Sequence, residues 1–160
     1  MLIVQEILGR AQDARYAGRV HEVLWIRAAD AGRRRLRAKT DGGLDVGLDL
    51  AKSEWLFDGA VLHDDGARLV VVARTPEPVM IVTLPENDLG TLFRIAHALG
   101  NRHAPVDLRE GTAVTQVTET PELAARPILA LGLPANSVRF DIIPFAAETP
   151  PTCTGAHHHG

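Results

Sequence analysis

The chain has 160 residues, of which 46% are hydrophobic and 23% are charged, and its formal net charge is −3. This length and apolar content fit one domain of ordinary size or two small ones, and they exclude a mostly disordered chain. The negative charge balance provides no global basic field for nucleic acid or anionic lipid, and no apolar run approaches the roughly 20 residues that span a bilayer.

The start of the chain and its cysteine content both indicate a reducing compartment. An acidic residue, Glu6, lies in the first segment, where a secretory signal needs positive charge. The single cysteine, Cys153, excludes an internal disulfide framework. We therefore expect a cytoplasmic protein that neither enters a membrane nor binds nucleic acid.

Residues 1–74 predict a β-rich domain. Short apolar runs at residues 2–8, 21–26 and 44–50 are separated by breaks that contain glycine and aspartate. The segments 41–43 (Asp-Gly-Gly) and 64–66 (Asp-Asp-Gly) each predict a hairpin turn. Trp25 and Trp55 supply large apolar area, so we expect both in the core of this domain.

Residues 75–78, Thr-Pro-Glu-Pro, form the expected boundary, because two prolines stiffen the chain and oppose strand pairing. A strand is then predicted at residues 79–84. A helix follows, capped by Asn87 or Asp88 and ended by Gly100. Its apolar residues recur at helical spacing, namely Leu89, Leu92, Phe93, Ala96 and Leu99.

Two short strands are predicted at residues 106–108 and 113–117. A second helix begins with Thr120 as N-cap and Pro121 at its first position, and it extends to Gly132. Pro127 is expected to kink or split this helix. A final strand is predicted at residues 137–145.

The order β-α-β-β-α-β over residues 75–145 is that of the split βαβ, or ferredoxin-like, unit. Residues 146–160 have no periodicity and predict a flexible tail. The expected fold class is therefore α+β, with an N-terminal all-β domain, a ferredoxin-like domain and a histidine-containing tail.

The tail ends with three consecutive histidines, His157, His158 and His159. Neutral imidazoles on such a tail are suitable ligands for Ni²⁺, Cu²⁺ and Zn²⁺. A remnant of a cloning tag is the other interpretation of this run. Cys153 could add a thiolate ligand, although nothing in its local sequence lowers the pKa of a thiol.

His103 follows the end of the first predicted helix. In one interpretation it only complements the negative end of the helix dipole. In the other it is a metal ligand, although a single histidine holds a divalent ion poorly, because two to four donors are normally needed. A two-fold axis near His103 would bring two copies together, and tethered tail histidines would complete the site.

The segment Gly100, Asn101, Arg102 and His103, followed by Pro105, resembles the urease accessory protein UreE family of nickel metallochaperones. The similarity extends over roughly residues 2–145 and the tail. Its other parts are residues 33–37, 40–43, 46–50 and 58–62 and the terminal histidines.

The resemblance implies a nickel carrier that delivers Ni²⁺ to apo-urease, with a first domain that docks partner proteins. It implies a homodimer formed through the second domain, in which His103 of each chain shares one nickel ion. His157, His158 and His159 carry over as accessory ligands. The apo-urease complex and its accessory GTPase are the implied partners.

The sequence also bears on two other function classes, a binding module that needs no metal and an enzyme. A metal-independent adaptor of urease maturation could use a face formed by Arg33, Arg35 and Arg37, although such a row often only protects a sheet edge. RNA binding is disfavoured, because the strands expected at 79–84 and 113–117 carry no aromatic residue for stacking. We expect no enzyme, since no phosphate-binding loop, nucleophile elbow or paired zinc-binding histidine motif is present.

Overall fold

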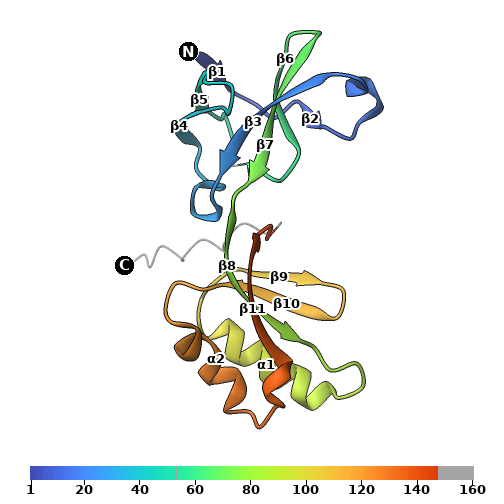
Figure 1. The fold of residues 1–160 in the computed structure, drawn as a ribbon, viewed down its shortest axis with the longest axis vertical. Coiled ribbons are helices and arrows are strands. Elements are labelled where there is room, and N and C mark those ends of the chain that lie inside the picture. Colours follow the sequence, from blue (N-terminus) through green and yellow to red (C-terminus); the bar gives the residue numbers. More distant parts are fainter. Residues whose placement is uncertain (53, 148–160) are drawn as a thin grey trace, which may run out of the picture. The chain divides into compact units, whose positions relative to one another are not determined.

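The computed structural model describes residues 1–52 and 54–147. The chain divides into two compact units, Met1–Thr75 and a second unit that begins at Pro76 (Figure 1). Each unit has its own hydrophobic core. No helix within the described ranges is long and apolar enough to cross a membrane.

The first unit contains two β-sheets and two short 3₁₀ helices. Its elements are β1 (Leu2–Val4), β2 (Gly9–Arg10), η1 (Ala14–Tyr16), β3 (Val20–Ile26), η2 (Ala28–Asp30), β4 (Arg35–Lys39), β5 (Asp45–Asp49), β6 (Ala60–Asp64) and β7 (Arg68–Arg74). One sheet has the order β1-β5-β4 and the other has the order β2-β6-β7-β3. Aliphatic residues from both sheets, among them Val46, Leu24 and Val72, pack into one core.

Both predicted hairpins are confirmed. Strands β4 and β5 pair antiparallel, as do β6 and β7. In the second turn the Asp65 carboxylate accepts hydrogen bonds from the backbone N–H of Arg68 (2.7 Å) and of Ala67 (2.9 Å). These bonds hold the pKa of Asp65 below its ordinary value. Gly66 closes the turn with a φ of +93°, a conformation that favours glycine.

Two expectations for this unit were wrong. The apolar run at residues 2–8 is a strand only over Leu2–Val4, where β1 pairs with β5, and β2 begins after the run at Gly9 and pairs with β6 in the other sheet. Trp25 is not in the core, because Leu24 and Ile26 take the inward positions of β3 and leave Trp25 53% exposed. Trp55 does pack, partly buried, against the core, beneath the guanidinium of Arg74.

The second unit is a four-stranded antiparallel sheet with two α-helices. Its elements are β8 (Pro76–Thr83), α1 (Leu89–Gly100), β9 (Val106–Arg109), β10 (Thr112–Gln116), α2 (Pro121–Leu129), η3 (Ala135–Ser137) and β11 (Val138–Pro144). The sheet order is β11-β8-β10-β9. Both helices pack on one face of the sheet, where Ile95 and Leu99 of α1 and Ile128 of α2 meet Met80 and Val82 of β8 (Figure 1).

The prolines at the boundary do not prevent strand pairing. Pro76 and Pro78 belong to β8 and lie opposite Pro144 and Ile142 of β11. Every second residue of a strand directs its backbone groups to the same side of the strand. The Pro78 carbonyl accepts a hydrogen bond from the backbone N–H of Val117, so the backbone groups of Pro76 and Pro78 point toward the side of β10. Strand β10 pairs with β8 only as far as Val79, so the missing proline N–H groups face no ladder position.

Pro127 does not split the second helix. It lies inside α2, which is continuous but ends at Leu129 rather than at Gly132. The expected N-cap is confirmed, since the Thr120 side chain accepts a hydrogen bond from the backbone N–H of Leu123. Gly132 follows with a φ of +78°.

The packing of Ile95 in the core of the second unit leads to a prediction about stability. Ile95 is fully buried between α1 and the sheet. Replacing Ile95 with alanine is expected to lower the free energy of unfolding by about 2–5 kcal/mol, because it removes buried methylenes and leaves a cavity. Val20→Ala, at an exposed apolar position of the first unit, is the control and should change it by less than about 0.5 kcal/mol. Urea unfolding followed by far-UV circular dichroism measures both, and equal effects would contradict the packing described.

Candidate metal centre

Helix α1 carries the candidate site, and Asp88 defines where it begins. The Asp88 carboxylate accepts hydrogen bonds from the hydroxyl of Thr91 (2.6 Å) and from its backbone N–H (2.9 Å). Asp88, one of the two residues expected to cap the helix, is therefore the N-cap. The Thr91 hydroxyl and then the Thr91 N–H hold the pKa of Asp88 below its ordinary value of 3.8.

This lowered pKa gives a pH-dependent prediction. The charged cap contributes fully to stability above about pH 4, and its contribution is lost as the pH falls through the lowered pKa of the folded state. Asp88→Asn keeps a capping oxygen but does not titrate. We expect the difference in urea midpoint between the wild type and this variant to be largest at pH 7 and to narrow at pH 3. A difference that stays constant over this range would contradict the assignment.

The end of α1 continues as a turn that presents His103. The backbone N–H of Asn101 bonds to the carbonyl of His97, that of Arg102 to Leu99 and that of His103 to Gly100, each at 3.0–3.1 Å. His103 has a φ of +50°. Glycine or asparagine usually occupies such a left-handed position after a helix, and other residues lose roughly 1–2 kcal/mol there. Histidine, with asparagine and aspartate, is among the non-glycine residues that most often adopt this conformation.

Arg102 attaches the same turn to the second helix. Its Nη1 donates to the carbonyl of Ala124 in α2 (3.1 Å), and its Nη2 donates to the carboxylate of Glu119, just before α2. The Arg102 side chain is only 17% exposed, whereas His103 is exposed to solvent. Arg102 thus fixes the backbone from which the neighbouring imidazole projects. In the sequence Arg102 stands out only as part of a motif, because its position between two helices is a tertiary feature.

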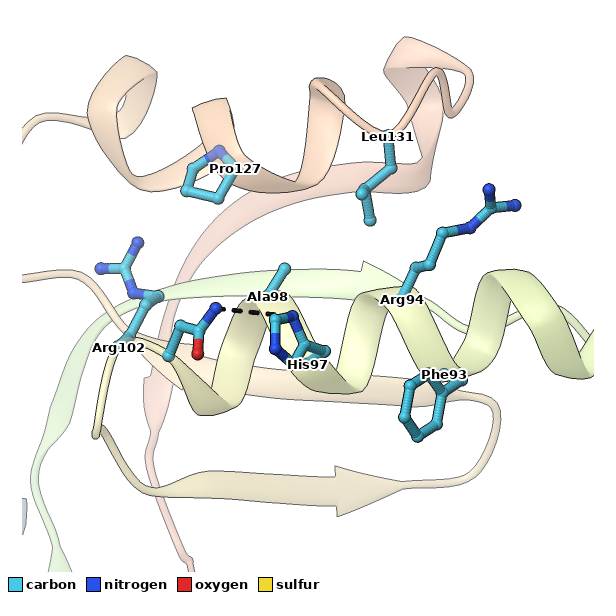
Figure 2. Close-up of a pocket in the computed structure, with 8 residues that line it drawn as sticks. Phe93, Arg94, His97, Ala98, Arg102, Pro127 and Leu131 are labelled. Carbon is cyan, nitrogen blue, oxygen red and sulfur yellow. Dashed lines mark hydrogen bonds between the residues drawn. The ribbon is translucent and has the colours of Figure 1, made fainter.

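A groove of about 490 Å³ lies between α1 and α2 (Figure 2). His97 lines it from α1, and Pro127 and Leu131 line it from the opposite side. The Nδ1 atom of His97 lies 3.4 Å from the side-chain nitrogen of Asn101. His97 is exposed, and His103 is not among the residues that line this groove.

One face of α1 is apolar and unpartnered within the described residues. Thr91, Ile95 and Leu99 point into the core, whereas Leu89 is 80% exposed and Phe93 is 73% exposed. The exposed positions Leu89, Phe93, Ala96, His97 and Gly100 recur at helical spacing. We call these five residues the α1 stripe. It lies on a side of α1 that does not face the sheet, and the turn that presents His103 follows this helix.

Of the predicted metal ligands, only His103 lies in the described part of the chain. His157, His158 and His159 fall outside the described residues, as does Cys153. Within the described ranges, no group of three or more histidine, cysteine, aspartate or glutamate side chains is placed to hold a metal ion. In the described part of one chain, His103 therefore has no second and third ligand of this kind beside it.

The arginine row of the first unit is neutralised by ion pairs. Arg35 pairs with Asp49 (3.0 Å), and Arg37 pairs with Asp45 (2.8 Å). The bond from Arg37 lowers the pKa of Asp45 and raises that of Arg37. Arg33 pairs with Asp30 at 2.9 Å. This face therefore carries alternating charge rather than a basic patch.

Comparison with known proteins identifies a matching family model and several relatives of this chain. Residues 4–74 match the family model described as the N-terminal domain of the UreE urease accessory protein. The chain is 30% identical over 115 residues to the urease accessory protein UreE of Geobacillus kaustophilus, which covers 72% of this chain and 76% of that protein. It is 38% identical over 128 residues to UreE of Burkholderia ambifaria, covering 79% of this chain and 58% of that protein.

These findings define a two-unit α+β protein whose second unit presents one exposed histidine at the end of a helix. The chain belongs to the UreE urease accessory protein family. It spans less than two thirds of the length of the Burkholderia relatives that it matches, among them UreE of Burkholderia mallei, which is 39% identical over 126 residues, 79% of this chain and 64% of that protein.

Proposed function

We propose that this protein is a nickel metallochaperone that delivers Ni²⁺ to apo-urease while the urease active site is assembled. Family membership supports a role in urease maturation. The observation that carries the metal-binding part is His103, exposed and left-handed at the end of the helix that bears the α1 stripe. The protein acts as a carrier in the cytoplasm and not as an enzyme.

The ion is held between two copies of the chain. One imidazole is too few for stable binding of a divalent cation, whereas a two-fold axis beside the end of α1 supplies His103 twice. The α1 stripe provides the apolar surface that such a dimer would bury. His157, His158 and His159 of either chain then complete the coordination as tethered ligands.

The ligand chemistry suits a carrier. Neutral nitrogen ligands bind Ni²⁺ well, and a site at a dimer surface without thiolates lets the ion leave again. The same ligands bind Zn²⁺ and Cu²⁺ in vitro, so selectivity depends on geometry and metal supply. Because imidazole binds metal only in its neutral form, nickel binding should be accompanied by proton release at acidic pH.

We assign the second unit to the ferredoxin-like arrangement, which its element order and its strand order support. This unit forms the homodimer. The first unit, residues 1–74, docks the apo-urease complex and its accessory GTPase. A metal-independent adaptor that uses the arginine row is the weaker alternative, because Arg33, Arg35 and Arg37 are each ion-paired.

Nickel transfer tests this function. The nickel-loaded protein, mixed with apo-urease complex and accessory GTPase in the presence of a competing chelator, should activate urease several-fold more than the same amount of nickel salt. The physical reason is that the carrier shields the ion until it is handed over. The same amount of nickel salt with the chelator and without the protein is the control, and equal activation with and without the protein would contradict a carrier function.

A further inference from the structure

The outer edge of β11 has no strand beside it in the described part of the chain. Strand β11 is the first in the sheet order and pairs only with β8. Phe140 is 41% exposed and Ile142 is 67% exposed on this strand. An exposed edge with apolar side chains is a template for pairing with another strand, which natural proteins either block or use.

The backbone groups of three residues point away from the sheet at this edge. The N–H of Ile142 donates to the carboxylate of Asp141 at 2.8 Å rather than to β8. Because backbone groups in an antiparallel ladder alternate in direction, Val138 and Phe140 present their N–H and C=O groups to the same free side. This edge therefore offers hydrogen bonds to a further antiparallel strand.

The sequence of β11 is complementary to itself around Phe140. In an antiparallel pair of two copies centred on Phe140, Arg139 lies opposite Asp141 of the second copy, and Val138 lies opposite Ile142. Arg139 and Asp141 are both exposed, and neither has an ion pair among the described residues. The pairing thus gives each charge a partner of opposite sign and places apolar residues beside one another on the other face.

We propose that β11 pairs with β11 of a second copy, which joins two four-stranded sheets into one continuous sheet. Asp141 then turns from the Ile142 N–H to Arg139 of the second copy, and the freed N–H donates to the carbonyl of Val138 there. The helical neighbour of β11 is α2, so this surface differs from the α1 stripe.

A cysteine cross-link tests the proposed register. In a Cys153→Ser background, Phe140→Cys should form a disulfide-linked dimer under mild oxidation, because the two Cα atoms would lie about 5.5 Å apart. Ile142→Cys is the matched control on the same face of the same strand. The two copies of position 142 would lie about 13 Å apart, a distance that no disulfide spans. Ile142 is more exposed than Phe140, so exposure alone would favour cross-linking of the control.

Reversing the charge of Arg139 or of Asp141 tests the proposed pairing between these two side chains. Arg139→Asp should lower the cross-linking yield of Phe140→Cys roughly tenfold, because two pairs per interface change from attraction to repulsion. Asp141→Arg should lower it similarly. A mixture of these two variants, and the double variant that exchanges both charges, should each restore the yield. Circular dichroism checks that the variants fold.

Two results would overturn the proposal. One is a yield for Phe140→Cys no higher than for Ile142→Cys, which would leave this edge to a strand of another protein or to solvent. The other is a yield that does not respond to either charge substitution, since the cross-link would then report random collision.

Discussion

Replacing His103 with alanine is expected to remove the nickel ion that the proposed dimer holds between its two protomers. The number of Ni²⁺ ions bound per dimer should fall by one, and the remaining affinity for Ni²⁺ should be at least roughly 100-fold lower. The reason is that a two-fold site loses two ligands at once, whereas even the loss of a residue that only orients a ligand costs 10–100-fold in affinity. Isothermal titration calorimetry with Ni²⁺ measures both quantities.

The backbone of His103 provides a control against misfolding. His103→Gly removes the same imidazole, but glycine accepts the φ of +50° without strain, so this variant should unfold at an equal or higher urea concentration than the wild type. His21→Ala removes an exposed histidine of the first unit and should leave the shared ion in place. Unchanged nickel stoichiometry and affinity in both His103 variants would show that the site lies elsewhere.

Replacing Phe93 with glutamate should convert the proposed dimer into monomers. Phe93 is 73% exposed at the centre of the α1 stripe, and the substitution would place two carboxylates in an apolar interface without partners. We expect the dimer dissociation constant to rise at least about 100-fold, which corresponds to about 3 kcal/mol. Light scattering coupled to size exclusion measures the mass, and the shared nickel ion should be lost with the dimer.

Val20→Glu is the matched control for this change. Val20 is an exposed apolar residue of β3, in the other unit, and its substitution adds the same charge. It should alter neither the mass nor the nickel stoichiometry. If Phe93→Glu remained dimeric, the α1 stripe would not be the dimer surface, and the position of His103 beside it would lose its significance.

The local chemistry of the chain was sufficient to predict much of the second unit. Thr120 and Asp88 cap the helices as expected, because an N-cap depends on a few neighbouring residues. The hairpin turns of the first unit were predictable for the same reason. The prediction at residues 2–8 was right only for Leu2–Val4, because an apolar run does not show where a strand ends.

Of the candidate site, only the identity of His103 was predictable from the sequence. The segment that contains His103 is recognisable in the sequence, but its left-handed backbone and the attachment of Arg102 to α2 are visible only in the folded unit. Metal ligation by His103 and by the tail histidines stays a prediction. Within the described residues one chain supplies no complete set of ligands, so the sequence of a single chain does not define the site.

Sequence alone determined the two helices with their N-caps and the two hairpin turns of the first unit, because capping, proline and glycine positions and apolar spacing act over a few residues. The tertiary structure decided which sides of these elements are buried. Helix α1 carries apolar residues on more than one side, and only packing against the sheet selected Ile95 for the core and left Phe93 exposed. In β3 the same competition placed Leu24 inside and Trp25 outside, since adjacent residues of a strand face opposite sides and one core can take only one of them.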